Sequence, residues 1–459
     1  MATGNFQSLQ TKLPKLGVIF IGRRRPGFDM DFGQSVEERV RGWLRGEKQV
    51  TWFEPAEKAV DDASLRRVMA ACEEQRVDAV VVLQATMGDG RLAPTMAQLW
   101  RDPIILWATP ENQQGDMISS CSLVGVHCWS SVLRQMRHGF ELVYGDPDDA
   151  ATRAQFIAAV RIAVSVRRLR TLRLGAIGGQ APGYFAMGAD PFSIHHGLGV
   201  QLQTYSLIEF ATVVNELKEN VVADDVAALK ALRLPSKDIT DDDLPMASRL
   251  YLALRSFMDT ENLDALTVRE WPEMPNVFGQ WPYLGVARLA DAGRAIGIEG
   301  DADGALTAWI GENLGLGRCY LTDWLEHDRE TITTWHGGAA PLSLCEPVGT
   351  PGGPQIARHF NIRKPAVVEA TLRANMPVTI TRLWRCDGQY FLTAREGESI
   401  RPRRHLMATN GLVRLTKQDP GAWFEELCHA GMPHHVAIFR GHHEALLRRF
   451  ARAMKMQVI

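Results

Sequence analysis

Few cysteines and no long apolar segment are the first features of this sequence. Its 459 residues contain an odd number of cysteines without a Cys-x-x-Cys pair, scattered along the chain at Cys72, Cys121, Cys128, Cys319, Cys345, Cys386 and Cys428. This pattern excludes a disulfide framework and a zinc ribbon and favours reduced thiols. No run approaches about 18 consecutive apolar residues, so no membrane-spanning helix is expected. The N-terminal residues lack the apolar core of a secretory signal, and we therefore expect a cytoplasmic protein.

A surplus of charge of either sign is also missing. The formal net charge is −2, so no global field would attract nucleic acid or an anionic membrane surface. The first expected strand is followed by Gly-Arg-Arg-Arg-Pro-Gly instead of G-x-G-x-x-G, which argues against a dinucleotide enzyme. With 46% hydrophobic and 23% charged residues, the composition is typical of a globular protein, and the length predicts two or three domains.

The N-terminal third alternates between buried strands and helices. Apolar runs at residues 16–21, 78–84 and 103–108, the second of them rich in valine, predict parallel strands, and helical periodicity follows the first of them at 35–45. Strands that alternate with helices predict a doubly wound α/β domain over residues 1–150. Ligands of such sheets gather at the carboxyl ends of the strands.

The same alternation begins again after residue 150 and stops near residue 345. It predicts a second doubly wound α/β domain over 151–345, with a long helix at 151–170 and strands at 172–178, 200–206, 265–270 and 317–323. From residue 346 the sequence becomes rich in β-branched residues, with strands expected at 366–372, 377–385 and 389–395. Residues 346–459 are thus predicted to form an antiparallel, barrel-like domain that includes a final helix at 442–454.

Three separated positions carry groups that suit a divalent cation. Glu299 stands in a glycine-flanked turn before a helix, Asp323 ends an expected strand, and the pair His434-His435 precedes the apolar run Val-Ala-Ile-Phe. Two carboxylates and an imidazole are suitable ligands for Mn²⁺. Each position has an ordinary alternative, namely an exposed loop acid, a helix N-cap and a surface histidine pair. Spacing alone does not decide between these readings.

Four motifs in one order supply a further argument. They are Glu299 with Asp-Ala-Asp-Gly-Ala-Leu-Thr, then Leu-Thr-Asp-Trp, then Trp-His-Gly-Gly-Ala-Ala-Pro-Leu-Ser-Leu, and finally Gly-Met-Pro-His-His-Val-Ala-Ile-Phe-Arg-Gly. In this arrangement the chain resembles the L-fucose/L-arabinose isomerase superfamily. The resemblance spans most of the chain and is strongest between residues 264 and 441.

The resemblance implies a set of site residues. Glu299, Asp323 and His435 would bind Mn²⁺ or another divalent cation, with His435 preferred over His434 because arabinose-type members use the second histidine. Glu299 and Asp323 would also be the catalytic acid/base pair. Asp301 and Asp303 would then have capping and turn roles, and His336 would bind the metal or only the substrate.

Further residues are expected on the substrate side. We expect Arg23 and Arg25 to bind an anionic sugar, because arginine forks bind sulfonate, phosphate or carboxylate groups well; a solvated turn or a subunit contact is the alternative. Gln84, His196 and Trp271 are further candidates for the substrate site. One departure from the family is Glu270, which stands where members often have cysteine and puts an extra carboxylate close to the site.

The function predicted from these residues is a Mn²⁺-dependent aldose–ketose isomerase. It would act on an open-chain sugar through a cis-enediolate, and an anionic hexose such as sulfoquinovose is a candidate substrate. The alternative is a non-catalytic sugar-binding protein that keeps the isomerase fold. The resemblance also implies a homo-oligomer, a trimer or hexamer, with the active site at a subunit boundary. No nucleic-acid or membrane partner is expected.

Overall fold

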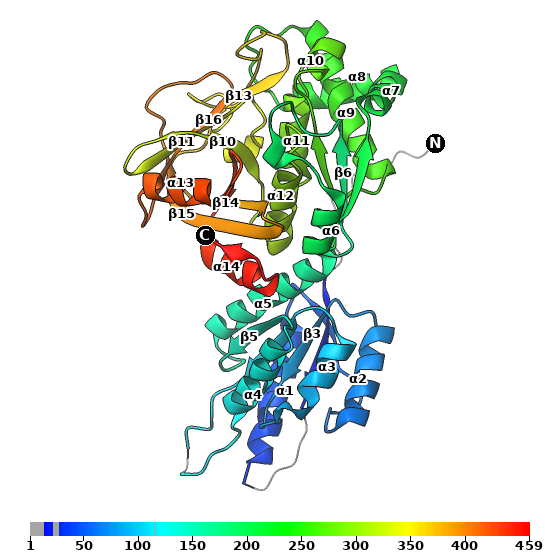
Figure 1. The fold of residues 1–459 in the computed structure, drawn as a ribbon, viewed down its shortest axis with the longest axis vertical. Coiled ribbons are helices and arrows are strands. Elements are labelled where there is room, and N and C mark those ends of the chain that lie inside the picture. Colours follow the sequence, from blue (N-terminus) through cyan, green and yellow to red (C-terminus); the bar gives the residue numbers. More distant parts are fainter. Residues whose placement is uncertain (1–12, 22–26, 115) are drawn as a thin grey trace. The chain divides into compact units, whose positions relative to one another are not determined.

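The computed structural model describes residues 13–21, 27–114 and 116–459, and the chain folds as two compact units, residues 1–168 and 169–459 (Figure 1). The predicted fold class, two α/β sheets followed by a barrel of antiparallel strands, is confirmed. No helix within the described ranges is long and apolar enough to cross a membrane.

The first unit is built on a five-stranded parallel sheet in the order β2-β1-β3-β4-β5. Its strands are β1 (Lys15–Phe20), β2 (Thr51–Phe53), β3 (Ala79–Leu83), β4 (Ile104–Ala108) and β5 (Phe140–Tyr144). Its helices are α1 (Met30–Gly46), α2 (Asp62–Glu74), α3 (Ala93–Leu99), α4 (Ser122–Gln135) and α5 (Ala150–Leu169). Two apolar cores, one on each face of the sheet, hold α1 and α5 on one side and α2, α3 and α4 on the other. This is the doubly wound arrangement that the alternating pattern predicts.

Helix α5 forms almost where the sequence predicts, but its apolar face packs into the core of the first unit. Phe156 and Val160 lie there among Trp43 and Trp107, all of them buried. The packing therefore divides the chain after residue 168. The division at residues 150 and 345 into three domains stays a prediction.

The second unit begins with a four-stranded parallel sheet in the order β7-β6-β8-β9. Its strands are β6 (Arg173–Ile177), β7 (Gln201–Tyr205), β8 (Ala265–Val268) and β9 (Ala295–Gly297). The helices of this region are α6 (Pro191–Leu198), α7 (Leu207–Glu216), α8 (Glu219–Ala231), α9 (Leu244–Thr260), α10 (Met274–Val277), α11 (Tyr283–Asp291) and α12 (Ala302–Leu314).

A nine-stranded sheet follows, and six of its strands close into an antiparallel barrel in the order β16-β11-β10-β17-β14-β15, with β15 returning to β16. The barrel strands are β10 (Tyr320–His327), β11 (Thr331–His336), β14 (Met376–Cys386), β15 (Gln389–Ile400), β16 (Thr409–Leu415) and β17 (His435–Arg440). The remaining elements are β12 (Gln355–Ala357), β13 (Val367–Thr371), β18 (Gln457–Val458), α13 (Pro420–His429) and α14 (Glu444–Ala453).

One predicted strand belongs to a different sheet from the one expected. The run at 317–323 was assigned to the second α/β sheet, but β10 pairs antiparallel with β11 and β17 in the barrel. An apolar run after a helix has the same sequence pattern in either sheet, so only long-range pairing decides its partners.

Helix α12 connects the two parts of the second unit. It packs against β8 and β9 on one side and against β14 and β17 on the other. Eleven of its residues are buried, because both sides face protein. A Cβ atom at Gly311 would lie 2.2 Å from the ring of Phe439, which shows how closely the helix approaches the barrel. The N-terminus of α12 is therefore held beside the barrel strands.

Candidate active site

The turn between β9 and α12 carries Glu299. Both Glu299 and Gly300 have a left-handed backbone, with φ of 57° and 76°. Glycine is required at the second position, since a Cβ atom at Gly300 would lie 2.1 Å from the carbonyl oxygen of Gly179. Asp301 then begins the helix as its N-cap, with its carboxylate accepting a 2.8 Å hydrogen bond from the backbone N–H of Gly304.

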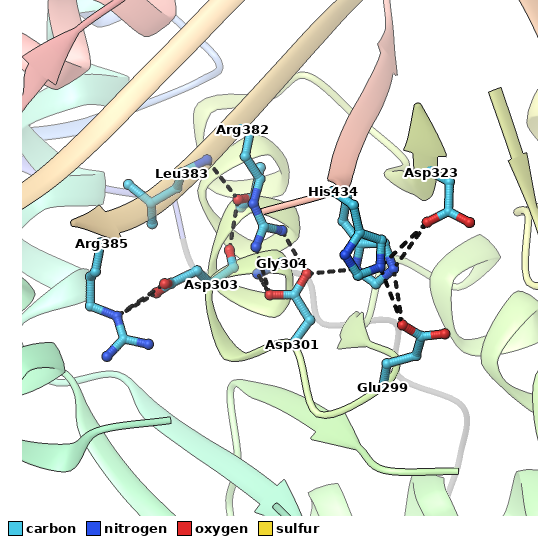
Figure 2. A network of polar contacts seen from close by, with 11 residues as sticks. Glu299, Asp301, Asp303, Gly304, Asp323, Arg382, Leu383, Arg385 and His434 are labelled. Carbon is cyan, nitrogen blue, oxygen red and sulfur yellow. Dashed lines mark hydrogen bonds and ion pairs between the residues drawn. The ribbon is translucent and has the colours of Figure 1, made fainter. Parts of the chain in front are cut away.

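Barrel strands bring the other candidate ligands to the same place. Asp323 on β10 is the register partner of His435 on β17, and the neighbouring strand β11 ends with His336. His434 lies immediately before β17 and is 40% exposed, whereas His435 is fully buried. Figure 2 shows the carboxylates of Glu299 and Asp323 directed toward the imidazole of His434.

The distances within this cluster are those of an open coordination site. His435 Nε2 lies 3.5 Å from Glu299 Oε2 and 3.6 Å from Asp323 Oδ1, and His434 Nε2 lies at the same two distances. His336 Nε2 is 3.8 Å from Glu299 Oε1. Two overlapping sets offer ligand atoms that all lie within 4.8 Å of one another: Glu299, His434 and His435, and Asp323, His336 and His435. The structure therefore brings together Glu299, Asp323 and His435 as predicted, with His336 beside them.

Unpaired buried atoms test whether a cation fits here. Glu299 Oε2, Asp323 Oδ1 and His435 Nε2 are buried and have no hydrogen-bond partner within the described part of the chain. An unpaired buried polar atom costs roughly 1–3 kcal/mol, so three at one point require a compensating ligand. A divalent cation accepts carboxylate oxygen and imidazole nitrogen together, and these residues fit one.

The orientation of His435 distinguishes it from His434. Its Nδ1–H donates to Asp301 Oδ2 at 2.8 Å, and Asp301 in turn binds Arg382 through two contacts of 2.7 Å. All three side chains are fully buried. The hydrogen bond holds the ring with Nε2 facing Glu299 and Asp323. The distances alone do not separate the two histidines, but burial and this bond favour His435.

Burial and neighbouring charges shift the pKa values of these groups in opposite directions. Burial lowers the pKa of His435, but the hydrogen bond and the charge of Asp301 outweigh it and leave the pKa raised. At Asp301 the cost of burial is outweighed by Arg382 and His435, which hold the pKa of this carboxyl far below its usual range. Burial lowers the pKa of His336. An imidazole that is neutral is a competent metal ligand.

Glu270 lies next to the cluster, as its position in the sequence suggests. It is fully buried, and its Oε2 accepts a 2.8 Å hydrogen bond from the backbone N–H of Glu299. Burial and the charge of Glu299 raise the pKa of Glu270 to about 8. Burial also raises the pKa of Glu299, but the nearby imidazoles of His434, His336 and His435 outweigh it, so this pKa is lowered. The two acids thus have different proton affinities.

No contact among the described residues joins the other predicted substrate residues to this cluster. Gln84 belongs to the first unit, where it is buried and accepts a hydrogen bond from the backbone N–H of Gly88 at 2.9 Å. His196 is exposed on α6 and contacts the ring of His195. Trp271 follows Glu270 and is 38% exposed. Arg23 and Arg25 lie outside the described residues.

Two residues of the site were missed by the sequence reading. Arg382 completes the buried chain from His435 through Asp301, and Tyr283 donates a 2.9 Å hydrogen bond from its hydroxyl to Glu270. Neither stands in a motif near the predicted ligands. Arg382 is one of many arginines, and its place within the largely apolar run Met-Pro-Val-Thr-Ile-Thr-Arg-Leu-Trp was the signal in the sequence.

The chain is similar to a known family and to several known proteins. The family described as "L-fucose isomerase, C-terminal domain" matches residues 366–459. A protein named sulfoquinovose isomerase from Priestia aryabhattai is 25% identical over 427 residues, covering 92% of this chain and 94% of that protein. Another of that name, from Alkalicoccus urumqiensis, is 27% identical over 386 residues, covering 83% and 86%.

A third relative is an L-arabinose isomerase from Thermotoga neapolitana. It is 25% identical over 200 residues, which cover 42% of this chain and 40% of that protein. The motifs, the fold class and these relatives agree. By these comparisons the chain is an aldose–ketose isomerase that is similar to members of the L-fucose/L-arabinose isomerase superfamily.

Proposed function

We propose that this protein is a Mn²⁺-dependent isomerase of an open-chain aldose that carries an anionic group, with the sulfonated hexose sulfoquinovose as the favoured substrate. The observation that carries the metal dependence is the convergence of Glu299 Oε2, Asp323 Oδ1 and His435 Nε2, all buried and all without a partner in the described chain. The substrate rests on the relatives named sulfoquinovose isomerase, which match over most of the chain.

Glu299, Asp323 and His435 would hold the cation, with His336 available as a fourth ligand. When bound, the cation supplies Lewis-acid stabilisation of negative charge that develops on the sugar oxygens. The two carboxylates form the acid/base pair: one takes the proton from C2 and returns it to C1 on the same face of a cis-enediolate, while the other moves a proton between the oxygens.

Oligomeric assembly and a cytoplasmic location remain predictions. The trimer or hexamer is expected from the superfamily, with the residues of a neighbouring copy completing each site. The contribution of Arg23, Arg25 and Gln84 to the binding of the anionic group belongs to this prediction.

A panel of aldoses with added Mn²⁺ tests the proposal. The metal-stripped protein should form no ketose, and Mn²⁺ should restore turnover of sulfoquinovose in preference to glucose, L-fucose and L-arabinose. In deuterated water, deuterium should appear at C1 of the ketose if a carboxylate transfers the proton.

Variants of the two acids should separate chemistry from binding. Glu299→Gln and Asp323→Asn should each lower kcat by about 10²-fold or more. Glu326→Gln is the matched control, since this exposed acid lies on the same strand as Asp323 and faces away from the cluster. Sugar binding without ketose formation would identify a binding protein, and full turnover after metal removal would reject the metal site.

A further inference from the structure

Glu270 is a fully buried acid that the proposed chemistry does not use. It lies two residues beyond β8, where both of its carboxylate oxygens meet internal donors. Oε2 accepts the backbone N–H of Glu299 at 2.8 Å, and Oε1 accepts the hydroxyl of Tyr283 at 2.9 Å. It belongs to neither set of potential metal ligands among the described residues. Its hydrogen bonds are therefore made with the backbone of Glu299 and with Tyr283, which support the site.

Glu299, whose backbone N–H donates to Glu270, has an unfavourable backbone conformation. A left-handed φ of 57° is uncommon for a glutamate and costs of order 1 kcal/mol or more. Hydrogen bonds hold both sides of this residue: its N–H donates to Glu270, and its carbonyl accepts from Ala181 at 2.8 Å. The N–H of Gly300 then donates to the carbonyl of Val268 at 3.0 Å. The turn is thus attached to the end of β8 through both a backbone carbonyl and the Glu270 side chain.

Tyr283 keeps Glu270 in place from the other side. Its ring is buried at the start of α11, stacked on Trp281 at 5.3 Å with an interplanar angle of 6°. It also meets the edge of His336 at 5.8 Å and 82°. A ring that is packed on both sides has little freedom, so its hydroxyl gives the Glu270 carboxylate a fixed direction.

We propose that Glu270, oriented by Tyr283, is a positioning residue that holds Glu299 in the left-handed conformation from which its carboxylate faces Asp323 and His435. This inference rests on the proposed metal-dependent function. The positioning role requires a hydrogen-bond acceptor at position 270, but it does not require a negative charge there. That requirement separates a positioning role from an electrostatic one.

Mn²⁺ binding to the purified, metal-stripped protein, measured by titration calorimetry, tests the inference without turnover. Glu270→Gln keeps an acceptor for the Glu299 N–H, and its amide can donate to the Tyr283 oxygen, so its Kd for Mn²⁺ should stay within about threefold of wild type. Glu270→Ala removes the acceptor and should raise the Kd about 10–100-fold, the range for supporting residues of metal sites.

A control variant separates a loss of stability from a loss of Mn²⁺ affinity. Leu266→Ala creates a cavity on the same buried strand, at a cost of about 2–5 kcal/mol, without touching the turn. It should leave the Kd for Mn²⁺ unchanged at a temperature where all variants are folded by circular dichroism. If Glu270→Ala does not fold, Tyr283→Phe, which frees one oxygen of Glu270, provides the test and should raise the Kd several-fold.

Three results would overturn the inference. They are an unchanged Kd in Glu270→Ala, an equal loss in Glu270→Ala and Glu270→Gln, and an equal loss in Leu266→Ala. Equal loss in both Glu270 variants would assign the effect to charge. Absence of Mn²⁺ binding by the wild-type protein would instead reject the proposed function itself.

Discussion

Removing the charge of Arg382 should be among the most costly single changes in the second unit. Arg382 and Asp301 are both fully buried and joined by two contacts of 2.7 Å. Arg382→Met has a similar volume but leaves the Asp301 carboxylate with only His435 and the N–H of Gly304. Breaking a buried pair on one side costs about 3–5 kcal/mol, and because Asp301 keeps two donors we expect about 3 kcal/mol.

Thermal unfolding followed by tryptophan fluorescence measures this cost. For a unit of this size, about 3 kcal/mol lowers the midpoint by roughly 5–10 °C. The double variant Asp301→Asn/Arg382→Met carries no buried unpaired charge and should be more stable than Arg382→Met alone. The difference between wild type and Arg382→Met should also shrink as the pH falls, because Asp301 loses the partner that keeps its pKa low and takes up a proton more readily.

The reasoning fails if Arg382→Met costs less than about 1 kcal/mol, since that would mean water or another donor already satisfies Asp301. It also fails if the double variant is less stable than the single one. Either result would show that the buried pair of Arg382 and Asp301 does not hold His435 in place.

Two further predictions concern the turn and a buried imidazole. Gly300→Ala should weaken Mn²⁺ binding at least about tenfold, because its Cβ would strike the Gly179 oxygen; Gly317→Ala, with a φ of 87° and open space around it, is the matched control and should leave the Mn²⁺ affinity unchanged. Burial lowers the pKa of His359 to about 4, so its neutral form contributes stability above pH 6.5 that is lost as the pH falls toward 4. His359→Gln should therefore lose about 3 kcal/mol less than wild type between these pH values in urea unfolding; parallel curves for the two proteins would contradict this.

Local chemistry was sufficient for the elements themselves. The valine run of β3 and the apolar run of β4 form strands where the pattern predicts them, because β-branched residues with no polar face require burial on both sides. Asp301 caps α12 as expected, since a carboxylate three residues before Gly304 can reach its free N–H. These features depend on neighbours in the chain.

The family motifs located the candidate ligands but not the residues that support them. Glu299, Asp323 and His435 converge as the resemblance implies, although 136 positions separate the first from the last (435 − 299). Which histidine of the pair faces the site depends on the register of β17 against β10, where Asp323 lies opposite His435. Register is set by pairing between distant strands, and no local pattern encodes it.

Only the tertiary structure shows the contacts of Arg382, Tyr283 and Glu270. Each contacts a residue at least 13 positions away, as the pair Tyr283 and Glu270 shows. Asp301 looks like an ordinary cap in the sequence, yet barrel closure places Arg382 and His435 on its two oxygens. The sequence by itself determined the elements and the ligand types, because these follow from periodicity and side-chain chemistry. The partners that orient those ligands follow from how the barrel packs on α12, which only the folded chain determines.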